Sequence, residues 1–307
     1  MTPTRRTGIL LALATAVVSG FAVFLNSYGV KAFGNPTAYT TAKNVVSALV
    51  LLAVVAVGLR ATSGVRLTWP RSTGQWWALG AIGVLGGSVP FVLFFEGLAR
   101  ASSPQAAFLH KTLVLWVAVL AVVFLSERLQ WGHWLAIGFL LVGQVGLLGG
   151  FPDSVGTPEA LILGATLMWA VEVIVAKRLL GAAVSSWTVG LARMGLGSVA
   201  LIGWVAVRGD LGLLTSMDAG QLGWVLLTGV LLAGYVGTWF AALQRARAVD
   251  VTAVLVLAVP ITAALDSVVH GTPLGPQLGW LALLLAGGAL VVLLAWRGAR
   301  RVVPVGA

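Results

Sequence analysis

Ten long apolar stretches follow one another along the chain, with little polar sequence between them. Each approaches the roughly 20 residues that an α-helix needs to cross the hydrocarbon core of a bilayer. Only 9% of the 307 residues are charged, whereas a globular domain carries roughly 25%. The sequence therefore predicts an all-α membrane protein. The predicted transmembrane helices cover residues 8–29, 36–59, 75–98, 104–125, 131–149, 158–176, 184–207, 222–243, 251–269 and 277–296.

The first apolar stretch has an alternative interpretation as a secretory signal, because Arg5 and Arg6 precede it and Ala12 and Ala14 resemble a cleavage site. The apolar run, however, continues to Phe24 and further spans follow. This length favours an uncleaved first transmembrane helix.

Basic residues are distributed unequally between the two sides of the predicted membrane. The formal net charge of +10 would suggest a nucleic-acid partner in a soluble protein, but in a membrane protein basic residues mainly set orientation. With the N-terminus inside, one side receives Arg5, Arg6, Arg60, Arg66, Arg71, Arg128, Lys177, Arg178, Arg245, Arg247, Arg297, Arg300 and Arg301. The other side receives only Lys31, Arg100 and Arg208. This bias predicts a multi-pass protein of the plasma (inner) membrane with both termini cytoplasmic and no nucleic-acid partner.

The two halves of the chain resemble each other. Residues 97–101 (GLARA) match residues 242–246 (ALQRA) at an offset of 145, and Lys43 falls on Arg193 at an offset of 150. Chance similarity between apolar segments is the alternative explanation. Because each half holds five spans, two repeats, 1–152 and 153–307, would be inserted in opposite orientations around a central cavity. Inverted repeats are typical of secondary transporters.

Two short motifs carry a resemblance to a known family. The turn GLARASSPQAA spans residues 97–107, and FLSERL, at residues 124–129, ends the fourth span with Glu127. With the ten spans, these motifs resemble the EamA-type branch of the drug/metabolite transporter superfamily over the whole chain. The resemblance implies helices around a central cavity and export of amino acids or other small metabolites. The chain departs from the family pattern at Leu115, where the second repeat has Pro260, and at Thr272, where the first has Glu127.

Besides Glu159 at the start of its span, six charged residues lie within the predicted spans, although Lys, Arg or Asp at the centre of a membrane helix costs about 2.5–3.5 kcal/mol. Such residues usually face a water-filled cavity or one another. Their depth predicts an outer group and a separate inner pair. The outer group would contain Lys43, Lys111, Glu96 and Asp266, and the inner pair Glu172 and Arg193.

These residues and nearby polar or aromatic side chains form the predicted binding site. Lys43, Lys111 and Arg193 are expected to contact an anionic substrate group, with Asn44 on the same helix face as Lys43. Mid-span aromatic residues are expected to stack on an apolar part of the substrate or to pack between helices. They are Trp169, Tyr235 and Trp239. Proton coupling or ion pairing is expected for Glu96, Glu172 and Asp266.

The leading function is a secondary active exporter that works by alternating access, and the alternative is a passive channel or facilitator for small polar solutes. An enzyme is not expected, because the chain has no Cys, three His and none of the phosphate-loop, zinc-protease or hydrolase motifs. We accordingly predict no catalytic residue, metal or cofactor. Besides the small-molecule substrate and membrane lipid, a second copy of the chain is a possible partner, because the apolar tenth span carries Ala282 and Ala286.

Overall fold

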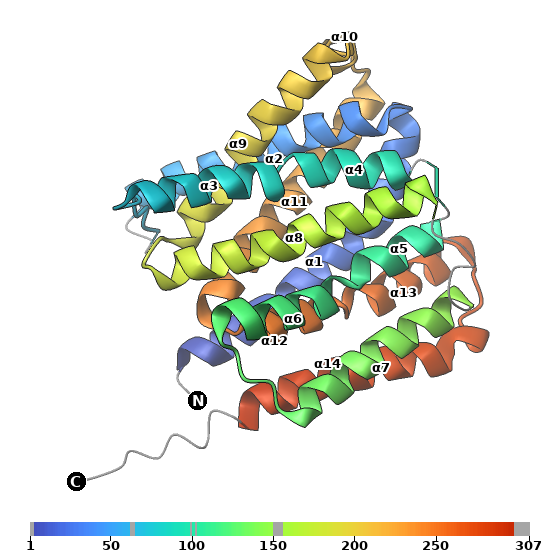
Figure 1. Ribbon diagram of the computed structural model, residues 1–307. Helices are drawn as coiled ribbons and strands as arrows, with labels where there is room; N and C mark the ends of the chain where they lie inside the picture. Colours follow the sequence, from blue (N-terminus) through green and yellow to red (C-terminus); the bar gives the residue numbers. More distant parts are fainter. Residues whose placement is uncertain (1–2, 62–64, 99, 102, 150–155, 298–307) are drawn as a thin grey trace.

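The structure is a computed structural model that describes residues 3–61, 65–98, 100–101, 103–149 and 156–297. Within these residues the chain is helical and contains no strand. Ten helical segments of the described chain are long and apolar enough to cross a membrane. The predicted fold class is therefore confirmed: this is an all-α, multi-pass membrane protein (Figure 1).

The first half of the chain forms five spans, of which the third and fourth are each broken into two helices. In order they are α1 (Pro3–Phe33), α2 (Pro36–Arg60), α3 (Thr73–Leu85) with α4 (Val89–Leu98), α5 (Ser103–Lys111) with α6 (Leu113–Leu125), and α7 (Trp131–Leu148).

The second half also forms five spans, and here only the fourth is broken. In order they are α8 (Thr157–Gly181), α9 (Ser186–Val207), the short α10 (Gly212–Thr215), α11 (Ala219–Arg245), α12 (Ala248–Leu255) with α13 (Ala258–His270), the turn η1 (Gly275–Gln277) and α14 (Leu278–Arg297).

Predicted and observed spans agree except at their ends, where some helices continue into polar residues. At the start of α11, for example, the Asp218 side chain accepts a hydrogen bond from Gln221 N (2.8 Å), so the helix begins three residues before the predicted Leu222. Such N-caps satisfy the free N–H groups of a first turn. Hydropathy alone does not identify such capping residues and therefore does not predict where these helices begin.

Proline explains two of the three breaks. A proline has no N–H to donate to the carbonyl four residues earlier. Pro90 thus leaves the Gly86 carbonyl free at the end of α3, and that carbonyl accepts a hydrogen bond from Trp169 Nε1 (3.2 Å). Pro260 stands in the same relation to Val256, where α12 ends. The third span is therefore joined to α8 through a backbone group that an unbroken helix would keep for itself.

The break between α5 and α6 has no proline. Thr112 occupies it, and its hydroxyl donates to Leu109 O (2.6 Å) and accepts from Trp116 Nε1 (3.2 Å). A side chain that competes for backbone carbonyls in this way weakens a helix locally. At the sequence offset of 145, Thr112 corresponds to Leu257, which lies between α12 and α13. The fourth span of each half is thus broken at the same level.

The helix contacts of one half recur in the other. Where α1 packs on α11, the equivalent α8 packs on α3 and α4; where α2 packs on α11, α9 packs on α3. The spans numbered two, four and five each pack on their counterpart in the other half, as α2 on α9, α6 on α12, and α7 on α14. The bundle therefore has nearly the same neighbours when its two halves are exchanged.

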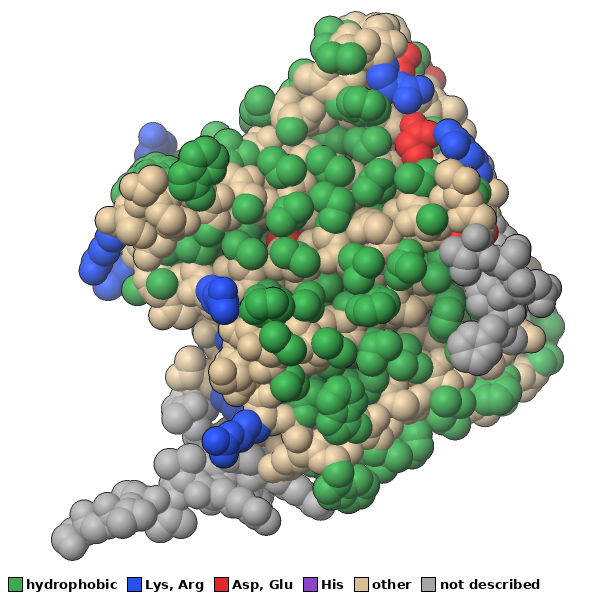
Figure 2. Space-filling model, in the orientation of Figure 1, with side chains coloured by type: hydrophobic (Ala, Val, Ile, Leu, Met, Phe, Trp, Pro, Cys, Tyr) green, Lys and Arg blue, Asp and Glu red, His purple; other side chains and the backbone are tan. Residues whose placement is uncertain are grey.

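The spans run roughly from left to right in Figure 1, and α1 and α8 begin at opposite ends. We call the left end, where α1, α3, α7, α9 and α12 begin, the inner end, because the charge bias predicts it to be cytoplasmic; the opposite end is the outer end. On the face drawn in Figure 2, hydrophobic side chains cover the middle, and charged side chains gather at the left and upper right edges. This distribution is expected of a protein surrounded by lipid.

Glycines allow α7 and α14 to approach closely. A Cβ added at Gly143 would lie 2.8 Å from a Leu284 methyl, and one at Gly287 would lie 3.0 Å from the Ala136 carbonyl oxygen. Gly287 therefore contributes to the packing of α14 against α7 within the chain. Ala282 and Ala286 are exposed, and the dimer contact through the tenth span stays a prediction.

Candidate functional site

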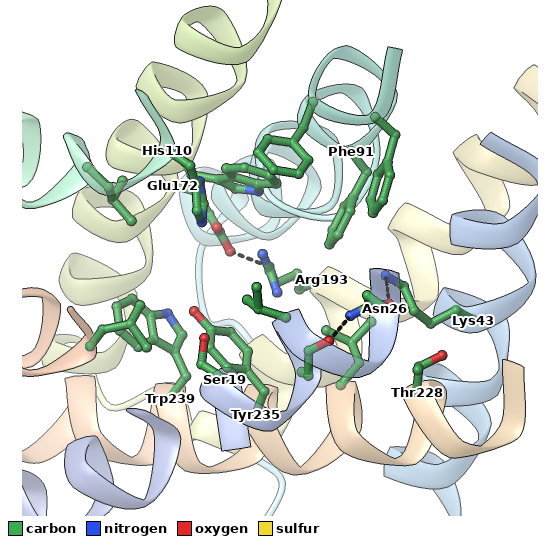
Figure 3. A pocket seen from close by; sticks show the side chains of 18 of the residues that line it. Ser19, Asn26, Lys43, Phe91, His110, Glu172, Arg193, Thr228, Tyr235 and Trp239 are labelled. Carbon is green, nitrogen blue, oxygen red and sulfur yellow. Dashed lines mark hydrogen bonds and ion pairs between the residues drawn. The ribbon is translucent and has the colours of Figure 1, made fainter. Parts of the chain in front are cut away.

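A cavity of about 180 Å³ lies where the two halves meet (Figure 3). Side chains from α1, α2, α4, α5, α6, α8, α9, α11 and α12 line it. A water molecule occupies about 30 Å³ in the liquid, so the space corresponds to about six waters or one small solute. The lining extends from Lys43 and Thr228, nearer the outer end, to Arg193 and Trp239, nearer the inner end, which places the cavity around the middle of the bundle.

An ion pair between α8 and α9 forms one wall. Arg193 Nε lies 2.8 Å from Glu172 Oε1, and both side chains are buried. The Phe91 ring lies 5.7 Å from the guanidinium carbon. Arg193 Nη1 has no hydrogen-bond partner among the described residues. The pair therefore leaves a donor to which a solute in the cavity could bind.

Lys43 lies on α2 and has no carboxylate partner among the described residues. Its ammonium donates to Asn26 Oδ1 (3.1 Å) and lies 4.9 Å from the centre of the Phe95 ring. Tyr39 donates to the same Asn26 oxygen (2.7 Å) and so fixes it. An amide and aromatic faces stabilise an ammonium ion without neutralising it. As an ammonium ion, Lys43 therefore lacks a counter-ion among the residues that the structure describes, and an anionic ligand would supply one.

Lys111 is the last residue of α5, at the break in the fourth span. Its side chain is 9% exposed and, within the described chain, makes no ion pair or hydrogen bond. The neighbouring His110 ring packs edge-on against Trp169, with 5.0 Å between ring centroids. Lys111 is thus a second lining cation without a carboxylate partner.

Aromatic rings complete the lining. Tyr235 and Trp239 of α11 are stacked, with 5.9 Å between centroids and 12° between planes. Phe91 and Phe94 of α4 both contact the Trp169 ring. A solute in the cavity would therefore meet apolar ring surfaces as well as charged groups.

The charges that line the cavity do not balance. Lys43, Lys111 and Arg193 contribute three positive charges and Glu172 one negative charge, so the excess is two positive charges when all four are ionised. Uncompensated charge is costly in a low-dielectric environment. The arrangement is suited to an anionic group.

The structure brings most of the predicted site residues together. Lys43, Lys111, Arg193, Glu172, Trp169, Tyr235 and Trp239 all line the cavity. The predicted ion pair of Glu172 and Arg193 is present. These two residues line the same cavity as the lysines, although their depth predicted a separate inner pair.

Three predicted residues lie elsewhere. Glu96 pairs at the outer end with Arg100 (3.0 Å) and with Arg208 (3.8 Å). Asp266 is 45% exposed on α13 and contacts His270. The expected outer group of two lysines and two carboxylates is therefore wrong, because residues at similar depth point in different directions around the bundle.

The third residue, Asn44, is buried beside the cavity but does not line it. Its Nδ2 donates to the Gly87 carbonyl (3.4 Å). Asn44 thus joins α2 to the break in the third span. Its predicted contact with substrate finds no support in this position.

Several residues that line the cavity were not predicted from the sequence. Phe91, Phe94 and Phe95 were not singled out, although their spacing of three and four residues places them on one helix face. Thr228, whose hydroxyl oxygen lies 2.9 Å from the Tyr39 hydroxyl oxygen, was not predicted either. A phenylalanine in an apolar span carries no signal of its own, but the helix-face spacing beside Pro90 could have suggested a lining role.

Comparison with known proteins agrees with this architecture. A chain described as an uncharacterized transporter in the cobO 3′ region of Sinorhizobium sp. is 27% identical over 100 residues, which are 32% of this chain and 68% of that protein. A solved crystal structure superposes with a TM-score of 0.76 at 20% identity and covers 94% of this chain and 99% of the other. At that identity the likeness shows the fold alone. The EamA-like transporter family matches residues 6–149 and 157–294, one stretch in each half. The chain thus belongs to the EamA-like transporter family.

Proposed function

We propose that the protein is a secondary carrier for small amphipathic metabolites that bear a carboxylate or another anionic group, with amino acids as the representative class. The observation that carries the proposal is the cavity itself, which combines an excess of positive charge with aromatic walls. A carboxylate would be bound by Lys43, Lys111 and the free donor of Arg193. The apolar part of the solute would contact the aromatic rings.

The size of the cavity supports a solute of this class. At about 180 Å³ it is smaller than the roughly 300–1,000 Å³ of sites for drug-sized ligands. Glu172 also lines the cavity, and its carboxylate would bind the amino group of a zwitterion.

Alternating access is proposed as the mechanism, in preference to a passive channel. The cavity lining does not continue to the inner end, where large side chains such as Ile9, Phe240 and Leu243 are completely buried. A channel would need a continuous path. The recurrence of helix contacts in the two halves supports a carrier, because exchange of shape between the halves would close one end and open the other.

Direction and location are part of the proposal. We propose that the protein lies in the inner membrane with both termini in the cytoplasm and exports its substrate. The charge bias described above supports this orientation, and export follows the family resemblance.

The first experiment is a thermal-shift screen of purified protein against amino acids and related carboxylates. A ligand at 100 times its Kd stabilises the folded state by about 2.7 kcal/mol, which raises the melting temperature measurably. The shift is expected to shrink or disappear in Lys43→Ala and Lys111→Ala, because a hydrogen bond to a charged group contributes about 1.5–3 kcal/mol. Lys31→Ala removes an exposed lysine at the end of α1 and is expected to keep the full shift.

Ligands that stabilise Lys43→Ala and Lys111→Ala as well as the unaltered protein would refute the substrate contacts. Counterflow in proteoliposomes then separates carrier from channel. A carrier preloaded with substrate takes up labelled substrate transiently and saturably, whereas a channel merely equilibrates it.

A further inference from the structure

The two halves of the ninth span differ sharply in burial. In α12, at the inner end, every residue from Ala248 to Leu255 is buried. In α13, at the outer end, Ala258 is the single buried residue of those described. The main neighbours of α13 are α1 and α14, whereas α12 also packs on α6, α8 and α11. The ninth span is therefore closely surrounded by other helices at its inner end and more exposed at its outer end.

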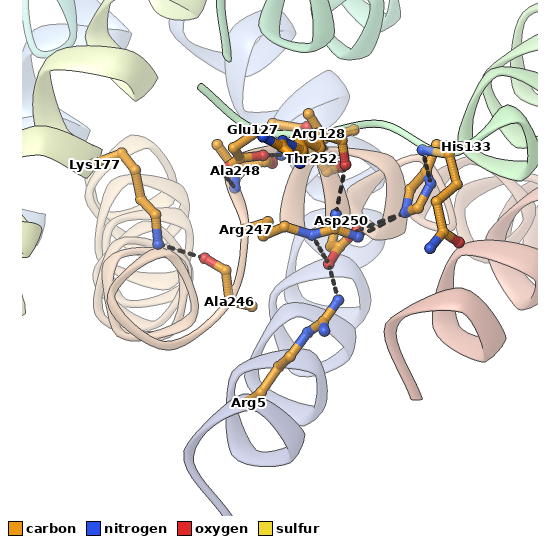
Figure 4. A network of polar contacts seen from close by, with 12 residues as sticks. Arg5, Glu127, Arg128, His133, Lys177, Ala246, Arg247, Ala248, Asp250 and Thr252 are labelled. Atoms are coloured by element: carbon orange, nitrogen blue, oxygen red, sulfur yellow. Dashed lines mark hydrogen bonds and ion pairs between the residues drawn. The ribbon is translucent and has the colours of Figure 1, made fainter. Parts of the chain in front are cut away.

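A network of charged groups lies at this inner end (Figure 4). Asp250 of α12 is its centre, and the side chain is completely buried. Arg247 donates to both carboxylate oxygens (3.1 Å each), and Arg5 of α1 donates to one of them (3.0 Å). His133 Nε2 of α7 lies 2.7 Å from Arg247 Nη2. One carboxylate thus joins α1, α7 and the start of α12.

Two further side chains bind the helix ends beside Asp250. Glu127 accepts hydrogen bonds from the N–H groups of Ala248 (2.8 Å) and Val249 (3.4 Å), and so caps α12 from the linker after α6. Lys177 of α8 donates to the carbonyls of Leu243 and Ala246 at the end of α11. Carboxylates at helix starts and cations at helix ends are favourable. The network therefore fastens α6, α8 and α11 to the same turn.

The network lies between the cavity and the inner end. Leu255 is the residue of α12 that lines the cavity, and Asp250 precedes it by five residues, or about 7.5 Å along a helix. A solute that left the cavity toward the inner end would have to pass this turn. Separation of α12 from α1 and α6 would break the contacts of Asp250 and Glu127.

The outer end has no corresponding network around a buried carboxylate among the described residues. Glu127 corresponds to Thr272 in the second half, and the Thr272 hydroxyl donates to the exposed Asp266 (2.8 Å). The ion pairs that Glu96 makes at the outer end are partly exposed. The contacts around the inner carboxylates are therefore not repeated in the part of the outer end that the structure describes, and the shared helix pairs form without them.

We propose that the contacts of Asp250 and Glu127 with Arg5, Arg247 and the start of α12 form the inner gate of the carrier, which is closed in this structure. Buried ion pairs add little net stability, because desolvation offsets their attraction, but they favour one of two discrete packings. The gate opens when α12 moves away from α1 and α6. This inference rests on the proposed carrier function, and its test needs no substrate.

The test uses the absence of cysteine from the chain, since any introduced cysteine is a unique reporter. Ala253→Cys places a thiol on α12 between the gate and the cavity, at a position that is completely buried. Ala22→Cys places one in the cavity wall on α1. The rate of reaction with N-ethylmaleimide is measured by mass spectrometry for each reporter in lipid nanodiscs, with and without Asp250→Asn.

If the gate is correct, Asp250→Asn accelerates labelling of the Ala253→Cys reporter at least tenfold. Labelling of the Ala22→Cys reporter changes little, because the cavity wall stays open to one face of the nanodisc or the other. Glu127→Gln, which keeps the size of the side chain, produces the same selective acceleration to a smaller degree. It also provides the test should Asp250→Asn not fold. The matched control is Asp210→Asn, which removes a carboxylate near Arg208 at the outer end and leaves both rates unchanged.

Unchanged rates in variants that elute as single, monodisperse species would overturn the gate. Comparable acceleration of both reporters would also overturn it, because that result indicates general loosening. Selective acceleration of the Ala253→Cys reporter in a protein that shows no counterflow with any tested metabolite would support the gate and refute the proposed substrate class instead.

Discussion

Arg193 and Glu172 show how much a single pair of residues can indicate about function. Both are buried in the cavity wall and are 2.8 Å apart. Replacing a buried ion pair by apolar residues of similar size is often neutral or stabilising. Stability therefore gives no reason for two charges at this depth, whereas solute binding does.

Substitution of Glu172 alone and of Glu172 together with Arg193 should affect stability differently. Glu172→Gln leaves Arg193 without its partner, and removal of one member of a buried pair costs about 3–5 kcal/mol. The melting temperature of the purified protein should fall clearly. Glu172→Leu combined with Arg193→Met should recover most of that loss and still fail in counterflow. Full counterflow by the double variant would assign the pair a purely structural role.

The charged members of the site could be singled out from the sequence because each interrupts an apolar span. Lys43, Lys111 and Arg193 all line the cavity, and their contact with substrate stays a prediction. Glu96 and Asp266 interrupt spans equally but contact partners at the outer surface. Position along a helix gives depth, whereas rotation about its axis and the identity of its neighbours depend on packing across the two halves, which the sequence of one span does not contain.

The break between α3 and α4 positions several parts of the site. It frees the Gly86 carbonyl for Trp169 and leaves room for Glu172, because a Cβ added at Gly86 would lie 2.2 Å from the Glu172 carboxyl carbon. Glycine is therefore required here by a neighbouring helix. Gly80, six residues earlier in α3, has no atom within 4 Å of such a Cβ.

These two glycines give a matched prediction. Gly86→Ala should displace Glu172 and lower stability by about 1–3 kcal/mol, the usual range for overpacking. Gly80→Ala should be neutral or slightly stabilising, because alanine favours the helix. Both are measured as melting temperatures in the same detergent. Equal stability of the two variants would contradict the close approach of α3 and α8.

Apolar stretches predicted the ten spans well, because the bilayer requires continuous helices of nearly constant length. The breaks were less predictable. Gly86, Gly87 and Pro90 lie at the break in the third span, whereas α11 continues through Gly234 and Gly237 without interruption, so glycine alone does not predict a break. Thr112 breaks the fourth span through side-chain hydrogen bonds, and nothing in its hydropathy distinguishes it from neighbours that remain helical.

At the scale of the whole molecule, α1 begins and α14 ends on the same side of the bundle. An even number of spans returns the chain to the side on which it began, and Figure 1 shows α1 beginning and α14 ending at the left. Charge asymmetry predicts that this side is cytoplasmic.

Reporter fusions test this orientation. A fluorescent protein that matures only in the cytoplasm should be bright when fused to either terminus, and a periplasmic phosphatase should be inactive at both. A fusion near Arg208, in the segment between α9 and α11, should give the reverse pattern and serves as the control. Opposite results at the two termini would be incompatible with ten spans.

Lys43 and Arg193 occupy corresponding places in the two halves, yet their partners differ: a carboxamide supports the lysine and a carboxylate holds the arginine. If the two halves exchange conformations during transport, the local environments of Lys43 and Arg193 are exchanged as well. A solute arriving from one compartment would meet a freer positive charge than a solute arriving from the other. Half-saturation concentrations should then be unequal on the two sides of the membrane.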